Sequence, residues 1–559
     1  MVLGFIIIAA SECSEVPTKI ITASEISAHI QNGAEYDHII VKGDLNLNAG
    51  LSEKSNVLDA IIRINDSIIE GNVNTNGLAF NQSLNFKNTR FEGIADFSGS
   101  KFEKAANFQK ARFDGPVYLG NTILKGAADF GNARFNSTAD FDRADFYATS
   151  NFERSNFAAP VSLEGSQFNE QTSFVDSKFD RDADFSEAQF KGKADFERSR
   201  FGGAADFSRS QFNRKATFSS AEFTEKADFE NANFRKDADF SIAQFNGVAH
   251  FEDSKFIGET SFRKSNFSDN AYFNSAQFGD NTGFKGSKFH RSAEFRKAQF
   301  YGIADISECL FEGNAEFDNI QFCSLASFWG TQFDNSVNIS NSKFIGDPNE
   351  WERYGVVDFS HAQFKERINF FNSQFSGDAK FNNTQFIGYV LNWQSIKDVF
   401  KSDNATYLSL IKNFGDHGQF NEADDCYYQY RRLVQDETSW SQRSKYTDIL
   451  AWLSCGYGVR SSHTIFSAII TLIIFGIIYS ARTRHNVLNK QDLRRRLFES
   501  LSFSLIVLIS APSDMYPFGS KRYLRFINQN RFLVVLERIT GWMLLILLIN
   551  TLSRVMIRY

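Results

Sequence analysis

Phenylalanine recurs through the middle of this chain at alternating steps of six and five residues, and no other feature limits the fold as strongly. Two series with an 11-residue period result, one from Phe91 to Phe344 and one from Phe97 to Ile339. Of their 47 positions 42 are Phe, and the other five are Leu or Ile. The pattern pauses at 347–354 and resumes at 359–386. With 62 Phe in 559 residues, this bias indicates an internal repeat.

The spacing predicts short extended segments rather than helices. Steps of five and six fit neither the 3.6-residue period of a helix nor the simple alternation of a long strand. A small residue stands two positions before most Phe, as Ala183 does before Phe185, and two such residues share one face of an extended segment. The polar residue between them, here Asp184, then points outward. The pattern therefore predicts coils that stack about 4.8 Å apart through backbone hydrogen bonds.

Two 11-residue units are expected to form one four-sided coil. The 55 inward positions counted from Phe80 to Phe386 then predict about 14 coils, a rod roughly 65 Å long at that strand spacing. We expect this solenoid at residues 80–390, after an N-terminal β cap at 13–79 whose residues 38–48 and 60–73 alternate like strands. The expected structural ladder includes Phe91, Phe97, Phe102, Phe185, Phe190, Phe240 and Phe245.

Two stretches carry a family resemblance. "ADFSEAQF" at 183–190 and "ADFENANF" at 227–234 are similar to the motif of the pentapeptide-repeat family, a small residue, Asp or Asn, Leu or Phe, and two variable residues. The resemblance implies a right-handed quadrilateral β-helix. This chain departs from the motif by one extra residue in every second unit, which predicts slightly larger coils with irregular corners.

Beyond residue 390 the apolar spacing becomes helical and then continuous. Residues 391–460 predict a linker with a helix hairpin, because apolar residues recur at helical spacing on both sides of a break at 415–419. Residues 461–559 predict a transmembrane domain, with spans at 464–481 and 534–557 and a half-span at 497–511. The 18 residues of 464–481 carry no charge and are long enough, as a helix, to cross the bilayer core. Buried core helices are the alternative.

The order of span, half-span and span resembles a two-transmembrane ion-channel domain found in prokaryotic pentapeptide-repeat proteins. Residues 426–432 ("CYYQYRR"), 455–459 ("CGYGV") and the last span share this resemblance. It implies a homo-oligomer formed through the transmembrane domain. A potassium-selective filter is not expected, because its consecutive carbonyls need Gly and the matching stretch has none. The candidate pore-lining residues are Ser510, Ala511, Pro512, Ser513 and Asp514.

Charge predicts how the chain crosses the membrane. Six basic residues separate the first span from the half-span, but only Lys445 and Arg460 lie in the 20 residues before residue 464. The positive-inside tendency places the basic loop in the cytoplasm and the solenoid outside. Residues 1–12 fit this orientation because 2–10 resemble the apolar part of a signal peptide; a buried strand and a misassigned start are the alternatives.

Composition excludes several classes of function. The five Cys and eight His show no metal-ligand spacing, and there is no phosphate loop or nucleophile elbow, so we expect no enzyme, no metal and no cofactor. The leading hypothesis is a membrane-anchored solenoid with a structural or protein-interaction role, whose partners are membrane lipid and a protein on the solenoid. A gated or non-selective ion channel, with the solenoid as sensor, is the second.

A third hypothesis is an inhibitor of topoisomerases that mimics DNA. It rests on the net charge of −14 in residues 1–390, against +8 in residues 391–559. It requires a solenoid in the cytoplasm, which the charge asymmetry around the first span disfavours. The overall net charge of −6 also argues against a protein that itself binds nucleic acid.

Overall fold

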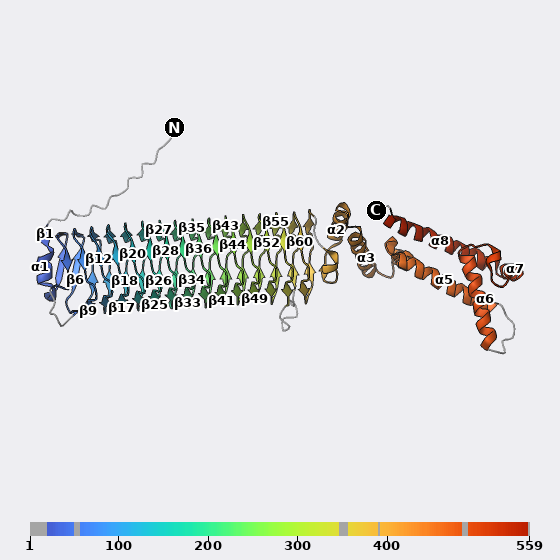
Figure 1. Cartoon of the computed structure of the whole chain (residues 1–559), viewed down its shortest axis with the longest axis horizontal. Coiled ribbons are helices and arrows are strands. Elements are labelled where there is room, and N and C mark those ends of the chain that lie inside the picture. Colours follow the sequence, from blue (N-terminus) through green and yellow to red (C-terminus); the bar gives the residue numbers. More distant parts are fainter. Residues whose placement is uncertain (1–18, 50–55, 346–355, 389–391, 483–489, 557–559) are drawn as a thin grey trace, which may run out of the picture. The chain divides into compact units, whose positions relative to one another are not determined.

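A computed structural model of the chain describes residues 19–49, 56–345, 356–388, 392–482 and 490–556 (Figure 1). The chain divides into two units, Met1–Thr406 and Tyr407–Tyr559. The signal-like segment at 2–10 and the pause in the repeat at 347–354 lie outside the described residues.

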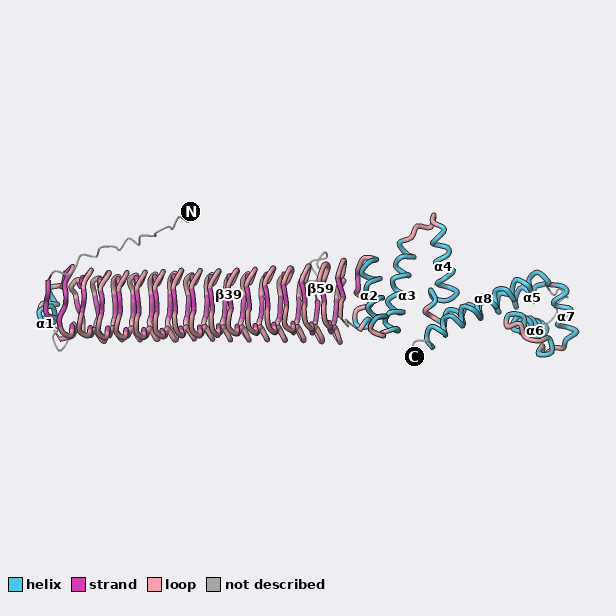
Figure 2. The backbone as a smooth tube through the Cα atoms, turned by 90° about the horizontal axis from the view of Figure 1, so that it is seen from above, coloured by secondary structure: helices cyan, strands magenta, loops and turns pink. Residues whose placement is uncertain are grey.

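The first unit is a four-sided parallel β-solenoid, as the repeat predicts. Its strands run from β1 (Lys19–Thr22) to β64 (Phe400–Lys401) and form four parallel sheets, two of 17 strands and two of 15. Figure 2 shows the stacked coils. Most strands have two residues; one coil contains β11 (Arg90–Phe91), β12 (Ala95–Asp96), β13 (Lys101–Phe102) and β14 (Ala106–Asn107). In the regular part of the repeat each strand pairs with the strand 22 residues further on, so two 11-residue units make one coil.

Stacked phenylalanine rings fill the interior of the solenoid. The rings of Phe185 and Phe207, one coil apart, lie parallel with centroids 4.7 Å apart, and Phe207 meets Phe218 edge to face at 5.2 Å. All of the ladder residues expected from the sequence, from Phe91 to Phe245, are buried. The ladder is therefore the core of the fold. The register survives the pause in the repeat, because Ala326 pairs with Val357 and the coil is enlarged by nine residues.

The solenoid is longer than the Phe series predicts. Residues 38–48 and 60–73 form strands as expected, but these strands pair into the same four sheets rather than making a separate cap. Ile, Leu and Val replace Phe in these first coils, as at Val41 and Ile69, which are in register with Phe91, so the coil count of 14 is too low. The elements outside the repeat at this end are α1 (Ala23–Ala28) and η1 (Ile30–Asn32), which bury Ile26 and Ile30.

The other end of the solenoid also passes the predicted boundary at residue 390. Here η2 (Trp393–Ser395) and β64 close the last coil. The ring of Phe400 stacks on that of Phe381 at 4.8 Å and contacts the buried Trp393 at 5.2 Å. These side chains continue the interior packing where the regular repeat has ended.

Each five-residue step is a tight β-turn whose third residue has a positive φ. In the turn that follows Phe240, the amide of Ala243 donates to the Phe240 carbonyl oxygen at 3.2 Å, and Ile242 has φ 61°. Asp239 supports this turn, because its Oδ1 accepts the amide of Ser241 at 3.0 Å. Asp96 and Asp184 do the same, which gives the outward Asp of the motif a role that spacing alone does not predict.

Ile242→Gly is expected to stabilise the solenoid by about 1 kcal/mol, because a β-branched residue in the left-handed region is strained and Gly is not. The matched control is Ile257→Gly. Ile257 is similarly exposed and has no positive φ, so Gly there should cost about 0.5–1 kcal/mol. Urea unfolding of the full-length protein measures both changes. Equal destabilisation by the two variants would contradict the proposed strain.

The second unit is helical, with α2 beginning just before it. Residues 404–437 form the predicted hairpin, and the two predicted spans are helices, while α4 and α7 were not predicted. The helices are α2 (Asn404–Asp416), α3 (Phe420–Glu437), α4 (Arg443–Cys455), α5 (Ser461–Arg482), α6 (Lys490–Leu508), α7 (Ser520–Gln529) and α8 (Arg531–Met556). Short 3₁₀ turns lie at η3 (Gly456–Gly458) and η4 (Ser513–Met515).

Candidate functional site

The features that could carry a function lie in the helical unit. Helices α5 and α8 are long and apolar enough, by length and composition, to cross a membrane. In the solenoid, by contrast, Phe and small side chains fill the interior. Among the described residues, no group of three or more His, Cys, Asp or Glu could hold a metal ion.

Helix α6 packs against α5 and runs in the opposite direction. A Cβ atom on Gly476 of α5 would lie 2.6 Å from Leu501 Cδ2, and Ser504 Oγ lies 3.1 Å from the Leu472 carbonyl oxygen. The chain then returns toward the beginning of α6, where the Tyr516 hydroxyl donates to the Glu499 carbonyl oxygen at 3.2 Å. The segment predicted as a half-span therefore enters the helix bundle and turns back. The helix also begins earlier than the predicted residue 497, because it includes the charged residues before the apolar run.

The candidate pore-lining residues form the start of this returning segment. Ser510 has φ 54°, and its hydroxyl accepts the indole N–H of Trp542 at 3.1 Å. Ala511 packs against the apolar core of the bundle, whereas Pro512 and Asp514 are exposed. Ser513 begins η4. The five residues lie together at one turn, and their lining of a pore stays a prediction.

Glu537 of α8 occupies the centre of the bundle and was not singled out by the sequence. It is 0% exposed. The Tyr479 hydroxyl of α5 donates to Glu537 Oε2 at 2.7 Å, and the Ser504 hydroxyl of α6 contacts Oε1. One side chain thus connects three helices. The sequence signal was available, since Glu537 is the single acidic residue within the bounds of α5 and α8.

The two motifs singled out by the resemblance, 426–432 and 455–459, meet beside the beginning of α5. Arg431 forms an ion pair with Asp448, and its guanidinium lies 5.4 Å from the ring centroid of Tyr457. Tyr457 has φ 56°, and its hydroxyl donates to Gln435 Oε1 at 2.7 Å. Burial raises the pKa of this hydroxyl, although the nearby Arg432 opposes the shift. These contacts hold a left-handed backbone turn between α4 and α5.

Further contacts join the same motifs to the start of α5. Arg460 forms an ion pair with Asp425 at 2.7 Å and lies over the ring of Tyr428, 5.1 Å from its centroid. Cys426 is fully buried. Burial raises the pKa of its thiol. The cluster is therefore a structural joint, and the "GYG" within it is part of that joint.

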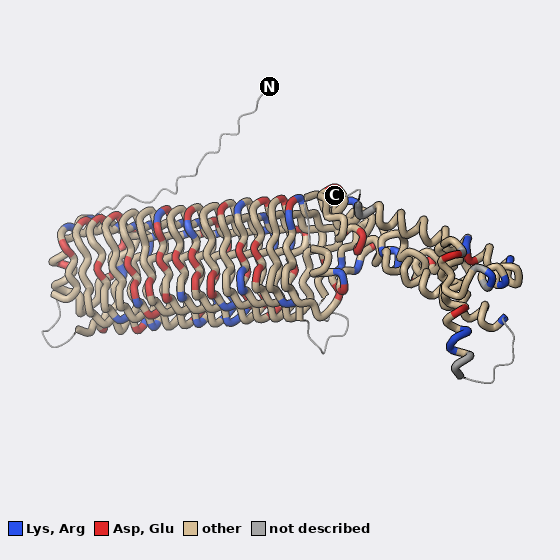
Figure 3. The backbone as a smooth tube through the Cα atoms, turned by 45° about the vertical axis from the view of Figure 1, so that its right-hand side comes forward, with Lys and Arg blue, Asp and Glu red and all other residues tan. Residues whose placement is uncertain are grey.

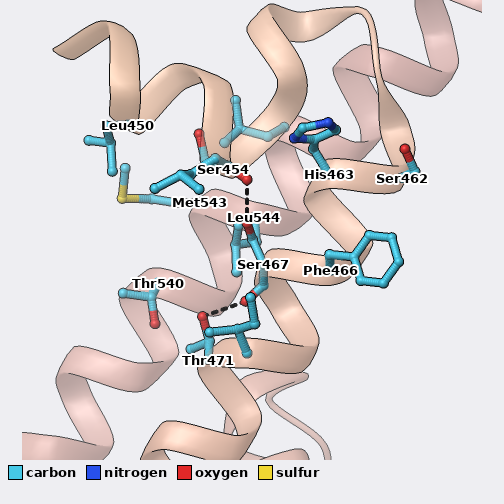
Figure 4. A pocket seen from close by; sticks show the side chains of 13 residues that line it. Leu450, Ser454, Ser462, His463, Phe466, Ser467, Thr471, Thr540, Met543 and Leu544 are labelled. Atoms are coloured by element: carbon cyan, nitrogen blue, oxygen red, sulfur yellow. Dashed lines mark hydrogen bonds between the residues drawn. The ribbon is translucent and has the colours of Figure 1, made fainter. Parts of the chain in front are cut away.

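An apolar groove of about 550 Å³ lies between α4, α5 and α8 (Figure 4). The Ser467 hydroxyl donates to the Leu453 carbonyl oxygen at 2.6 Å, and the Thr471 hydroxyl donates to the backbone carbonyl oxygen of Ser467 at 2.7 Å. Because these hydroxyls are used by the backbone, the wall is mainly hydrocarbon. A second groove of about 410 Å³ lies between α5, α6 and α8, beside Trp542. Neither lining includes Asp, Glu, Lys or Arg.

The architecture defines the class of protein: a parallel β-solenoid followed by helices, two of which could span a membrane. Its solenoid belongs to the pentapeptide-repeat family. The family model described as pentapeptide repeats (9 copies) matches seven segments of the solenoid, 77–123, 119–167, 152–200, 196–241, 243–288, 273–321 and 284–332. Two further comparisons, with curated proteins and with solved structures, found no match.

Proposed function

We propose that this protein is a membrane-anchored solenoid that presents its repeat on the extracytoplasmic face as a structural or protein-interaction surface. The observation that carries the proposal is the inverted polarity of α5 and α8. Most residues in the apolar parts of the two helices are not buried, and side chains such as Ile474 and Ile546 are half exposed. Glu537, by contrast, is fully buried. A core helix of a soluble protein has the opposite arrangement, whereas a lipid-facing helix has this one.

Helix α4 extends the apolar surface. It buries Lys445, whose ammonium donates to the Gln435 carbonyl oxygen and lies 5.2 Å from the ring centroid of Trp440. It exposes Tyr446, Leu450 and Leu453. Leu450 and Leu453 also line the groove of Figure 4, so this surface continues onto α5 and α8. Contact with membrane lipid accounts for both the exposed apolar side chains and the buried lysine.

The proposed orientation rests on the distribution of basic residues. Because α6 turns back, the connection between the two spans stays on one side of the proposed membrane. This connection contains Arg494, Arg495 and Arg496 before the apolar part of α6, and Lys521 and Arg525 in α7. Such an excess of basic residues favours the cytoplasm, which leaves the solenoid outside.

The solenoid surface supports a binding role without catalysis. Ion pairs join adjacent coils, as Arg198 does with Asp176 at 2.8 Å and Arg200 with Glu222 at 2.6 Å. Figure 3 shows Lys and Arg among Asp and Glu along the coils. Mixed and paired charges of this kind favour a solvated surface that a protein partner can cover, rather than a continuous DNA-like row of acids.

Protease treatment of intact cells that express the full chain tests the orientation. We expect the solenoid to be cut or released before lysis, since nothing would shield an extracytoplasmic domain from added protease. An endogenous cytoplasmic protein serves as the control and should survive until lysis. A solenoid that is protected in intact cells and cut only after lysis would overturn the proposed orientation and reopen the DNA-mimic hypothesis.

The returning segment after α6 favours an ion channel as a second candidate function. In a homo-oligomer arranged around an axis, the segments at 510–514 of several subunits would converge, and Asp514 would face the permeating ions. Planar-bilayer recording of the purified protein tests this function. A conductance that changes selectivity in Asp514→Asn would support it. The absence of conductance would remove it and leave the anchored solenoid unaffected.

A further inference from the structure

The Glu537 carboxyl group is an ionisable group inside a proposed membrane domain, with no cationic partner. Among the described residues, no Lys, Arg or His nitrogen lies within the 4.0 Å ion-pair distance of its oxygen atoms. Arg538, the next residue in α8, does not pair with the Glu537 carboxyl group. Its guanidinium donates instead to the Tyr523 hydroxyl of α7 at 3.1 Å. A carboxylate that is removed from water and left without a cation is costly.

The groups that face Glu537 come from every helix packed around it. Helix α5 contributes the Tyr479 hydroxyl and α6 contributes the Ser504 hydroxyl, while Tyr523 of α7 contacts Phe503 in the same cluster as Tyr479. Its own helix contributes Arg538, which is engaged with Tyr523. The two groups that touch the carboxyl oxygens are therefore neutral hydroxyls. They provide hydrogen bonds but no compensating charge.

The hydrogen bonds of Ser504 determine where protons lie. A serine hydroxyl carries one hydrogen and can donate it once. Ser504 Oγ nevertheless lies at hydrogen-bond distance from two acceptors, Glu537 Oε1 and the Leu472 carbonyl oxygen of α5. Both contacts are hydrogen bonds only if Ser504 donates to Leu472 and Glu537 donates to Ser504. That arrangement requires a hydrogen on Glu537.

We propose that Glu537 is a proton-binding site that connects the re-entrant helix α6 to the two spans. In the protonated state, Glu537 donates to Ser504, Ser504 donates to Leu472, and Tyr479 donates to the second carboxyl oxygen. The reaction is simple: the carboxylate takes up one proton from water, and no other bond forms or breaks. Loss of the proton removes the Ser504–Leu472 link and leaves an unpaired charge among apolar side chains.

The position of the site indicates where the proton enters and what it controls. Tyr479 lies three residues before Arg482, the end of α5, so the site is about one helical turn from the basic side of the bundle. Ser504 lies near the end of α6, just before the turn at 510–514. Release of the proton therefore loosens the part of α6 that positions this turn.

Infrared spectroscopy of the full-length protein in phosphatidylcholine bilayers tests the proton directly. At neutral pH we expect a C=O stretching band of a protonated carboxylic acid, shifted by ¹³C labelling of glutamate and lost in Glu537→Gln. The matched control, Glu499→Gln in α6, removes an acid paired with Arg495 and should retain the band. A wild-type protein without the band, or a band that survives in Glu537→Gln, would overturn the proposal.

Stability measured against pH provides a second test. The proposal gives the folded site a proton at neutral pH, whereas an unfolded glutamate releases its proton near pH ~4.3. The folding equilibrium constant should therefore fall by up to about tenfold per pH unit above this value, until the folded site also loses its proton. Glu537→Gln keeps the shape of the protonated group and should remove this dependence. Equal pH dependence in the two proteins would refute the site, even if both fold.

Discussion

Phe207→Ala is expected to lower the free energy of unfolding of the surrounding coils by about 3–5 kcal/mol. The Phe207 ring is fully buried between those of Phe185 and Phe229, with centroids 4.7 and 4.9 Å away. Removal of the ring leaves a cavity, because the stacked rings of Phe185 and Phe229 on either side cannot move in to fill it. Because each coil contacts only adjacent coils, the loss should concentrate there. Hydrogen–deuterium exchange on the full-length protein measures it as faster exchange of the amides in these three coils.

The solenoid offers a matched control for this substitution in Phe371→Ala. Phe371 lies in the same repeat, beside the buried Phe370, but its side chain is 65% exposed. Its removal should change stability by no more than about 0.5 kcal/mol, as is usual for surface positions. Equal effects of the two substitutions would show that the stacked rings do not hold the coils together.

The architecture of the solenoid could be predicted because its information is local and repeated. A Phe and a small residue two positions apart determine one side of a coil, and dozens of such sides reinforce one period. The side-chain roles in the corners were not predictable in the same way. The hydrogen bond from Asp239 to the turn and the positive φ of Ile242 depend on backbone geometry that the period does not contain.

The first coils show where a pattern based on one residue type stops being informative. Val41 and Ile69 occupy the interior positions that are filled by Phe91 and its equivalents in the later coils, yet they are not Phe. Any apolar side chain of suitable size can fill such a position, since burial does not depend on the aromatic ring itself. The regularity of the Phe ladder therefore marks only part of the solenoid.

In the helical unit, too, features that depend on local sequence were predictable, and features that depend on long-range contacts were not. The two helices that could span a membrane were predictable from their long, mainly apolar sequence. The contacts of Glu537 were not, because its partners Tyr479 and Ser504 lie 58 and 33 residues away and reach it only after α6 has turned back. The joint between 426–432 and 455–459 likewise depends on α3 and α4 packing together. Sequence identified these stretches but gave no reason for them.

Gly541→Ala should destabilise the helical unit by about 1–3 kcal/mol, the usual cost of overpacking, although Ala favours a helix more than Gly does. A Cβ atom at this position would lie 2.1 Å from the carbonyl oxygen of Leu508, at the end of α6. Since that neighbour is backbone, the contact can be relieved only by moving α6 away from α8. We expect a lower thermal midpoint for the helical circular-dichroism signal of the full-length protein in detergent.

Gly415→Ala in α2 is the matched control. It adds the same methyl group and the same gain in helix propensity without the close contact. A Cβ atom on Gly415 would meet nothing within 4 Å, so the change should be neutral or stabilising by up to about 1 kcal/mol. The end of α6 touches α8 at Gly541, four residues after Glu537, so Gly541→Ala should also weaken the Ser504 contact. The infrared band of the protonated Glu537 carboxyl group at neutral pH should then be smaller in Gly541→Ala than in Gly415→Ala. Unchanged stability and an unchanged band in Gly541→Ala would mean that α6 does not pack closely against α8.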